Sequence, residues 1–306
     1  MAAKRIIIDT DPGIDDALAI LLACASPELA VLALTTVAGN VRLELTTANA
    51  LRLLELAGRP EIPVYPGCDA PLQRMLVTGQ VHGATGLDGA ELPAPKQRAE
   101  PRHGVDYLIE TLSAAEPASV TLAAIGPLSN VAAALQRAPA IERALAGLVV
   151  MGGATPGIGG NMSPHAEFNI LVDPEAAALV FSKRLPITLV PLDLSHKICA
   201  SPERVRRIAE IGGPVGRTVS GMLRHYCESE PFMHDPLTIA WLLRPELFSG
   251  RRAFVHVETL GISDGETVFD WHKDGNCLVL LDGEEDGFFE LLIARLARLQ
   301  GDRELV

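Results

Sequence analysis

The sequence has no long uninterrupted apolar run, no run of basic residues and no CxxC pair. A helix needs about 20 predominantly apolar residues to span a bilayer, so the first absence excludes a transmembrane helix. The N-terminal stretch MAAKRIIIDTD contains only a short apolar segment that acidic residues follow at once, which is not the pattern of a signal peptide. We therefore expect no membrane partner.

The lack of a basic run goes with a formal net charge of −12 at pH 7. An acidic protein has little nonspecific attraction for nucleic-acid phosphates or anionic lipids. Arg204, Arg206 and Arg207 lie close together, but on a predicted surface helix, where solvated side chains are the simplest interpretation. Nucleic acid is therefore not an expected partner.

Cysteine is scarce, with five in the chain and no metal-binding or redox spacing among them. The odd count and the mostly apolar surroundings favour buried free thiols over a disulfide framework. Such usage is typical of a reducing compartment, and we expect a cytoplasmic enzyme.

Apolar residues make up 48% of the 306 residues, enough for a sizeable core. Short β-branched runs alternate with helical patterns, which predicts an α/β fold with a parallel, doubly wound sheet flanked by helices. No repeat or linker divides the chain, so we expect a single domain over 1–306. The predicted strands are 4–8, 29–37, 62–65, 120–125, 147–151 and 187–190, with a later antiparallel addition at 255–258, 268–270 and 278–281. The predicted helices are 14–24, 43–56, 103–114, 128–136, 173–182, much of 201–243, and 284–299. A Pro/Gly-rich loop is expected at 67–102.

Ligands bind at the carboxyl ends of the strands in such sheets, and an acidic run follows the first predicted strand. Asp9, Asp11, Asp15 and Asp16 fall within eight residues and would repel one another unless a cation neutralises them. Helix capping explains Asp15 and Asp16, but it does not explain the two acids at the strand end. Carboxylate oxygens suit Ca²⁺ or Mg²⁺, so we interpret the run as a divalent-metal or catalytic site.

Two other acidic motifs fit this run less well. An EF-hand would need Gly and Glu where the chain has Ile14 and Ile20. The DxDx[T/V] motif of haloacid-dehalogenase-like phosphatases fits up to its fifth position, which is Gly13. A phosphatase with Asp9 as the nucleophile therefore stays as the alternative, although no convincing downstream lysine and acidic pair accompany it.

Further polar residues follow the other predicted strands. Asn40 follows the second strand, and the carbonyl of Ile125 ends a later one. A Gly-rich loop after Met151 lacks GK[ST] and GxGxxG, and it leads to Asn161 and the segment AEFN at 166–169. On an extended segment, Glu167 and Asn169 would face the same side, where they would suit the vicinal hydroxyls of a sugar. Surface-loop polarity is the competing interpretation of this pair.

A last candidate pair, His234 and Asp235, opens an apolar helix. Asp235 fits an N-cap, since Pro236 occupies the next position. His234 beside it is the strongest candidate for a proton donor in this segment.

Together these motifs resemble the nucleoside hydrolase family, of the inosine–uridine-preferring type. The resemblance extends along nearly the whole chain in order: DTDPGIDDALAI at 9–20, AGN at 38–40, VHGATGLDG at 81–89, IGPLSN at 125–130, GN at 160–161, AEFNI at 166–170 and HDPL at 234–237. It implies an open, mostly parallel sheet with the site at the strand ends, and a homodimer or homotetramer. It also implies hydrolysis of the N-glycosidic bond of ribonucleosides by a calcium-bound water, in nucleoside salvage.

The resemblance further implies roles for individual residues. The Ca²⁺ ligands would be Asp11, Asp16, Asp235 and the Ile125 carbonyl, with Asp9 supporting them from behind. Asp11 would also be the general base, and His234 would protonate the departing base. The ribose would be held or lined by Asp15, Asn40, Met151, Asn161, Glu167 and Asn169. The stretch 216–233 is shorter than is usual for the family. The base-pocket candidates are His82, Arg224, His225, Tyr226 and Glu228.

Overall fold

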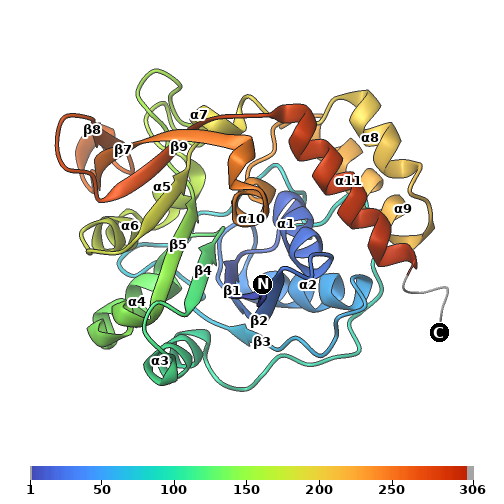
Figure 1. Ribbon diagram of the computed structural model, residues 1–306, viewed down its shortest axis with the longest axis horizontal. Helices are drawn as coiled ribbons and strands as arrows, with labels where there is room; N and C mark the ends of the chain where they lie inside the picture. Colours follow the sequence, from blue (N-terminus) through green and yellow to red (C-terminus); the bar gives the residue numbers. More distant parts are fainter. Residues whose placement is uncertain (1, 302–306) are drawn as a thin grey trace.

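The computed structural model describes residues 2–301 (Figure 1). Within them the strands form a nine-stranded sheet in the order β3-β2-β1-β4-β5-β6-β9-β7-β8. The strands are β1 (Lys4–Thr10), β2 (Leu29–Thr36), β3 (Val64–Pro66), β4 (Val120–Ala124), β5 (Leu145–Met151), β6 (Ile187–Val190), β7 (Phe248–Val257), β8 (Thr267–Asp270) and β9 (Cys277–Gly283). One sheet running through the chain agrees with a single domain over 1–306, which stays a prediction.

The sheet confirms the predicted α/β class. Strands β1 to β6 and β9 pair in parallel, while β7 pairs antiparallel with β9 and β8. Strand β7 begins at Phe248, seven residues before the predicted start at 255. A register shift between Ser249 and Gly250 breaks the alternation there, and four successive residues are exposed, so periodicity could not detect this half of the strand.

Helices cover both faces of the sheet (Figure 1). The helices α3 (Gly104–Ala114), α4 (Ser129–Arg137) and α6 (Pro174–Phe181) contribute to one buried cluster, on one face. The other face is covered by a second cluster that includes α1 (Ile14–Cys24), α2 (Leu43–Leu56), α8 (Pro202–Ala209), α9 (Gly213–Tyr226), α10 (Pro236–Leu243) and α11 (Glu285–Gly301). These helices agree with the predicted ones to within a few residues at their ends.

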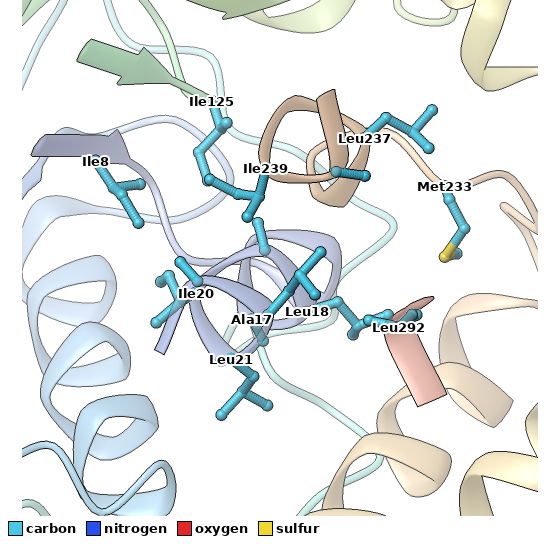
Figure 2. Close-up of a cluster of buried hydrophobic side chains, with 14 of the residues drawn as sticks. Ile8, Ala17, Leu18, Ile20, Leu21, Ile125, Met233, Leu237, Ile239 and Leu292 are labelled. Carbon is cyan, nitrogen blue, oxygen red and sulfur yellow. The ribbon is translucent and has the colours of Figure 1, made fainter. Parts of the chain in front are cut away.

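Helix α1 is central to the second cluster, because all of its residues are buried. Figure 2 shows it beside α10, with Leu18 of α1 and Leu237 and Ile239 of α10 in one buried cluster. Ile8 of β1 and Ile125, which follows β4, belong to the same cluster. Burial of apolar area on every side therefore fixes the two helices against each other. The beginning of α1 and the beginning of α10 consequently lie together at the carboxyl ends of the strands.

The segment between β3 and α3 contains no helix or strand, as predicted for 67–102. It is nevertheless held to the rest of the fold by side chains. Arg74 makes ion pairs with Glu175 and Asp264, and Asn49 donates to the carbonyl oxygen of Thr85 at 2.8 Å. These contacts hold the loop over the edge of the sheet where the strands end.

Short elements were not predicted. They are α5 (Phe168–Val172), α7 (Leu192–Ser195) and the 3₁₀ turns at Pro139–Ala144, Pro245–Leu247 and Gly261–Ser263. Segments this short carry too few residues for a helical period to show. Across residues 2–301, none of the helices combines the length and apolar character needed to cross a bilayer.

Candidate active site

A cavity of about 380 Å³ opens at the carboxyl ends of β1, β2, β4 and β5. Residues far apart in the sequence line it, because parallel strands all end at this edge. The lining includes ten of the predicted site residues: Asp15, Asn40, His82, Ile125, Met151, Asn161, Glu167, Asn169, His234 and Asp235. Asp11 and Asp16 do not line the cavity and are fully buried.

Acidic side chains form the floor of the cavity. Asp15 and Asp16, in the first turn of α1, meet Asp235, which precedes α10, with one oxygen of each lying within 4.8 Å of the others. The three-carboxylate cluster thus contains Asp15, which was assigned to the ribose from sequence. Asp11, from the loop after β1, is close enough to raise the pKa of Asp235 by charge repulsion.

Hydrogen bonds orient the two deeper carboxylates. Asp16 accepts from the Thr10 hydroxyl at 2.5 Å, the Gly13 N–H at 3.0 Å and the Asn40 amide at 3.1 Å. Asp11 accepts from the backbone N–H of Asn40 at 2.7 Å through Oδ2, whereas its Oδ1 is buried and has no hydrogen-bond partner among residues 2–301. Asn40 therefore organises both acids and leaves one oxygen of Asp11 free for a ligand.

Burial raises the pKa of each acid on this floor, and repulsion among the neighbours raises those of Asp11, Asp16 and Asp235 further. Burial also raises the pKa of Asp15, although the nearby His234 partly offsets it. Buried charges of one sign this close are unfavourable unless a cation or protons neutralise them. An all-oxygen donor set with an unpartnered buried oxygen fits a hard divalent cation.

Asp9 lies behind this floor. Its Oδ1 accepts from Thr35 at 2.5 Å and from Asn130 at 2.8 Å, and burial raises its pKa to about 7. Asp9 does not line the cavity.

The segment 166–170 corrects one expectation. Glu167 and Asn169 are not on an extended segment, because Glu167 caps α5 and accepts from the N–H groups of Asn169, Ile170 and Gly153 at 2.9, 3.1 and 3.1 Å. Both side chains still line the cavity. The Asn169 amide donates to the carbonyl oxygen of Ile125 at 3.1 Å, so this carbonyl also faces the site.

Two histidines line the cavity. His82 accepts from the Ile14 N–H through Nδ1 at 3.0 Å, and burial lowers its pKa to about 4, so it is neutral with its proton on Nε2. Its ring stacks on Tyr226 with the centroids 5.3 Å apart. In His234, Nδ1 contacts the Ser195 hydroxyl at 2.8 Å. Burial opposes its charged form, but Glu230 and Asp15 outweigh burial and raise the pKa of His234.

Asp235 also departs from its simplest sequence interpretation. It precedes α10 at the N-cap position, yet its side chain makes no capping hydrogen bond and joins the acidic cluster instead. Its carbonyl oxygen accepts from the Thr238 hydroxyl at 2.7 Å. Pro236 needs no N–H partner, so the helix begins without using the carboxylate.

The base-pocket candidates separate into two groups. His82 and Tyr226 line the cavity, whereas Arg224, His225 and Glu228 do not. Glu230 lines the cavity but was missed from sequence. It lies in an irregular turn between α9 and α10, where spacing does not determine which way a side chain points. The one feature of the sequence that could have pointed to Glu230 is its position four residues before His234.

Known proteins resemble this chain over nearly its whole length. The model of the inosine-uridine preferring nucleoside hydrolase family matches residues 6–290. The pyrimidine-specific ribonucleoside hydrolase RihA of Photobacterium profundum is 44% identical over 312 residues, covering 96% of this chain and 99% of that protein. Among solved structures, a purine-preferring ribonucleoside hydrolase from Gardnerella vaginalis has a TM-score of 0.91 at 28% identity, over 97% of this chain and 99% of that one. The plant nucleoside hydrolase PpNRh1 has a TM-score of 0.88 at 33% identity, over 96% and 99%.

The predicted activity agrees with these relatives, and the phosphatase alternative finds no support among them. The protein is a ribonucleoside N-ribohydrolase, which cleaves the N-glycosidic bond between ribose and a nucleobase. The chain belongs to the inosine-uridine preferring nucleoside hydrolase family.

Proposed function

We propose that this hydrolase acts on pyrimidine ribonucleosides with Ca²⁺ held by Asp11, Asp16, Asp235 and the Ile125 carbonyl. The observation that carries the metal assignment is the unpartnered Oδ1 of Asp11 among buried carboxylates that raise one another's pKa. The Asn169 amide donates a hydrogen bond to the carbonyl oxygen of Ile125, which supports the assignment of this oxygen to the site. When bound, Ca²⁺ would supply a positive charge that attracts water and ribose hydroxyl oxygens and lowers the pKa of the water.

The ribose would lie over the acidic floor. Carboxylate and carboxamide groups from four parts of the chain face this volume and accept or donate hydrogen bonds to its hydroxyls: Asp15, Asn40, Asn161, Glu167 and Asn169. Met151 supplies an apolar contact. Several acceptors around one sugar ring also stabilise the positive charge that develops on ribose as the glycosidic bond breaks.

Two residues move protons in this scheme. Asp11 accepts a proton from the attacking water, since its carboxylate lies beside the proposed metal that would hold this water. His234 donates a proton to the departing base, and its raised pKa, which Glu230 and Asp15 cause, favours the protonated ring that this step requires. A pyrimidine leaves poorly as an anion, so protonation in the transition state lowers the barrier.

The preference for pyrimidines rests on relatives, since the similar RihA proteins are named pyrimidine-specific. The test is release of reducing sugar from uridine, cytidine, inosine, adenosine and guanosine, with and without a chelator. We expect uridine or cytidine to react fastest, and activity to disappear with chelator and return with Ca²⁺. Faster purine hydrolysis, or full activity in chelator, would refute the proposal.

We also propose a homodimer or homotetramer in the cytoplasm that serves nucleoside salvage. The family resemblance supports the assembly, and the free thiols of Cys24 and Cys277, both buried, agree with a reducing compartment. Light scattering of the purified protein tests the assembly directly. A monomeric mass at micromolar concentration would contradict it.

A further inference from the structure

Two buried polar atoms face each other at one wall of the cavity. His234 Nε2 and Glu230 Oε1 lie 3.6 Å apart, and in the part of the chain that the structure describes neither has a hydrogen-bond partner. Leaving buried polar atoms unpaired is costly, so such atoms in a binding cavity indicate groups that a ligand satisfies. Both residues line the cavity, and 17% of the Glu230 side chain remains exposed.

Besides raising the pKa of His234, the carboxylate of Glu230 has no assigned role. Four acidic residues line the cavity: Asp15, Glu167, Glu230 and Asp235. Asp15 and Asp235 belong to the acidic floor, and Glu167 accepts three backbone N–H groups as the cap of α5. Glu230 is therefore the lining carboxylate that is assigned neither to the acidic floor nor to the ribose, so it is free to accept a hydrogen bond from the base.

The cavity lining also offers flat and apolar surfaces, as a planar nucleobase requires. The His82 ring stacks on Tyr226, and Val81 and Phe168 line the same cavity. His234 Nδ1 is engaged with the Ser195 hydroxyl at 2.8 Å, so Nε2 is the ring nitrogen that faces the cavity; it carries a proton when Ser195 donates to Nδ1 and also when the ring is charged. The wall thus presents an N–H donor beside a carboxylate acceptor.

We propose that Glu230 determines base specificity by accepting a hydrogen bond from a ring N–H of the base while His234 donates to the adjacent carbonyl oxygen. This inference rests on the proposed function and narrows its substrate class. Uracil has such an edge, a ring N3–H between two carbonyl groups. Cytosine has an unprotonated N3, whose lone pair would face the carboxylate, so uridine is the preferred substrate over cytidine.

The test compares two substrates in two enzymes. Uridine and 2-pyrimidinone riboside differ at the base edge, because the second has no N3–H. Their ratio of kcat/KM is measured in the wild type and in Glu230→Gln, so that intrinsic differences between the leaving groups cancel. Glu228→Gln is the matched control, since Glu228 is exposed on the same turn and does not line the cavity.

We expect the uridine-to-analogue ratio to fall at least about tenfold in Glu230→Gln, the range lost with a charge-assisted hydrogen bond, and to stay within about twofold in Glu228→Gln. Glutamine can donate to an unprotonated N3, so cytidine should improve relative to uridine. Glu230→Met, which neither accepts nor donates strongly, should lower the ratio without that improvement. Circular dichroism confirms that each variant is folded.

Equal losses on both substrates would overturn the proposal, because they would mean that Glu230 acts only by supporting His234. A ratio that Glu230→Gln and Glu230→Met leave unchanged would overturn it as well. Failure of the proposed function gives a different result, since the wild type would then release ribose from purine nucleosides faster than from uridine. The two failures are thus distinguished by the wild-type measurements alone.

Discussion

Replacing Asp11 by asparagine should raise the stability of the metal-free protein and nearly abolish its activity. The Asp11 side chain is fully buried, and repulsion from Asp16 and Asp15 adds to burial in disfavouring its charge. Asparagine has the same shape, and its oxygen can still accept the Asn40 N–H that Asp11 Oδ2 accepts at 2.7 Å. The substitution therefore removes one buried like charge while keeping the hydrogen bond.

The size of the expected gain in stability follows from the environment of the carboxylate. A buried charge without a partner costs about 3–5 kcal/mol. In Asp11 the cost is smaller, because one of the two oxygens already accepts a hydrogen bond from the Asn40 N–H. We therefore expect metal-free Asp11→Asn to be more stable than the metal-free wild type by about 1–3 kcal/mol at pH 7. Calcium at 100 times its dissociation constant would stabilise the wild type by about 2.7 kcal/mol, and the variant by much less.

The assay is urea unfolding in chelator and in excess Ca²⁺, followed by the kcat for uridine. Activity should be nearly abolished, because the same residue is the proposed ligand and base. A variant that retains more than about a tenth of the wild-type kcat would refute its role in proton transfer. A metal-free variant that is less stable than the wild type would refute the electrostatic reasoning, since it would show that the acidic floor is not under repulsion.

Three further outcomes follow from the structure. His234→Ala should reduce turnover of uridine far more than that of p-nitrophenyl riboside, whose leaving group needs no proton; equal losses would exclude His234 as the acid. Asp9→Asn should stabilise the metal-free protein increasingly between pH 4 and 7, by up to about 4 kcal/mol, because the raised pKa of Asp9 makes the folded wild type lose stability as pH rises through that window. A pH-independent difference in urea unfolding would contradict this. Leu237→Ala should cost about 2–5 kcal/mol in the packing of α10 on α1, with little change in KM at 25 °C.

The order of strands and helices could be predicted because their patterns are local. Helix α1 follows from the apolar run after Asp16, and the parallel sheet follows from the alternation of elements. The first half of β7 could not be predicted, because a register shift and exposed arginines hide its period. The short helix α5 was mistaken for extended chain, since Glu167 caps it through backbone contacts that no sequence pattern encodes.

The candidate site was predictable where residues follow strands directly. Asp11, Asn40 and Ile125 each follow a strand end, and parallel strands bring such positions to one edge. The roles of these residues remain predictions. Glu230 could not be identified, because its side chain direction depends on an irregular turn that packs between α9 and α10.

The sequence by itself determined the class of fold, the acidic run Asp9–Asp16 and, through its ordered motifs, the family. Those properties depend on residue types at short spacing, which the chain displays directly. Only the tertiary structure decided which acidic side chains lie close together. The carboxylate of Asp235 lies beside those of Asp15 and Asp16, whereas Asp9 is outside this cluster and accepts hydrogen bonds from Thr35 and Asn130. The physical reason is that packing of α1 against α10 fixes distances between segments more than 200 residues apart, and no local pattern contains that information.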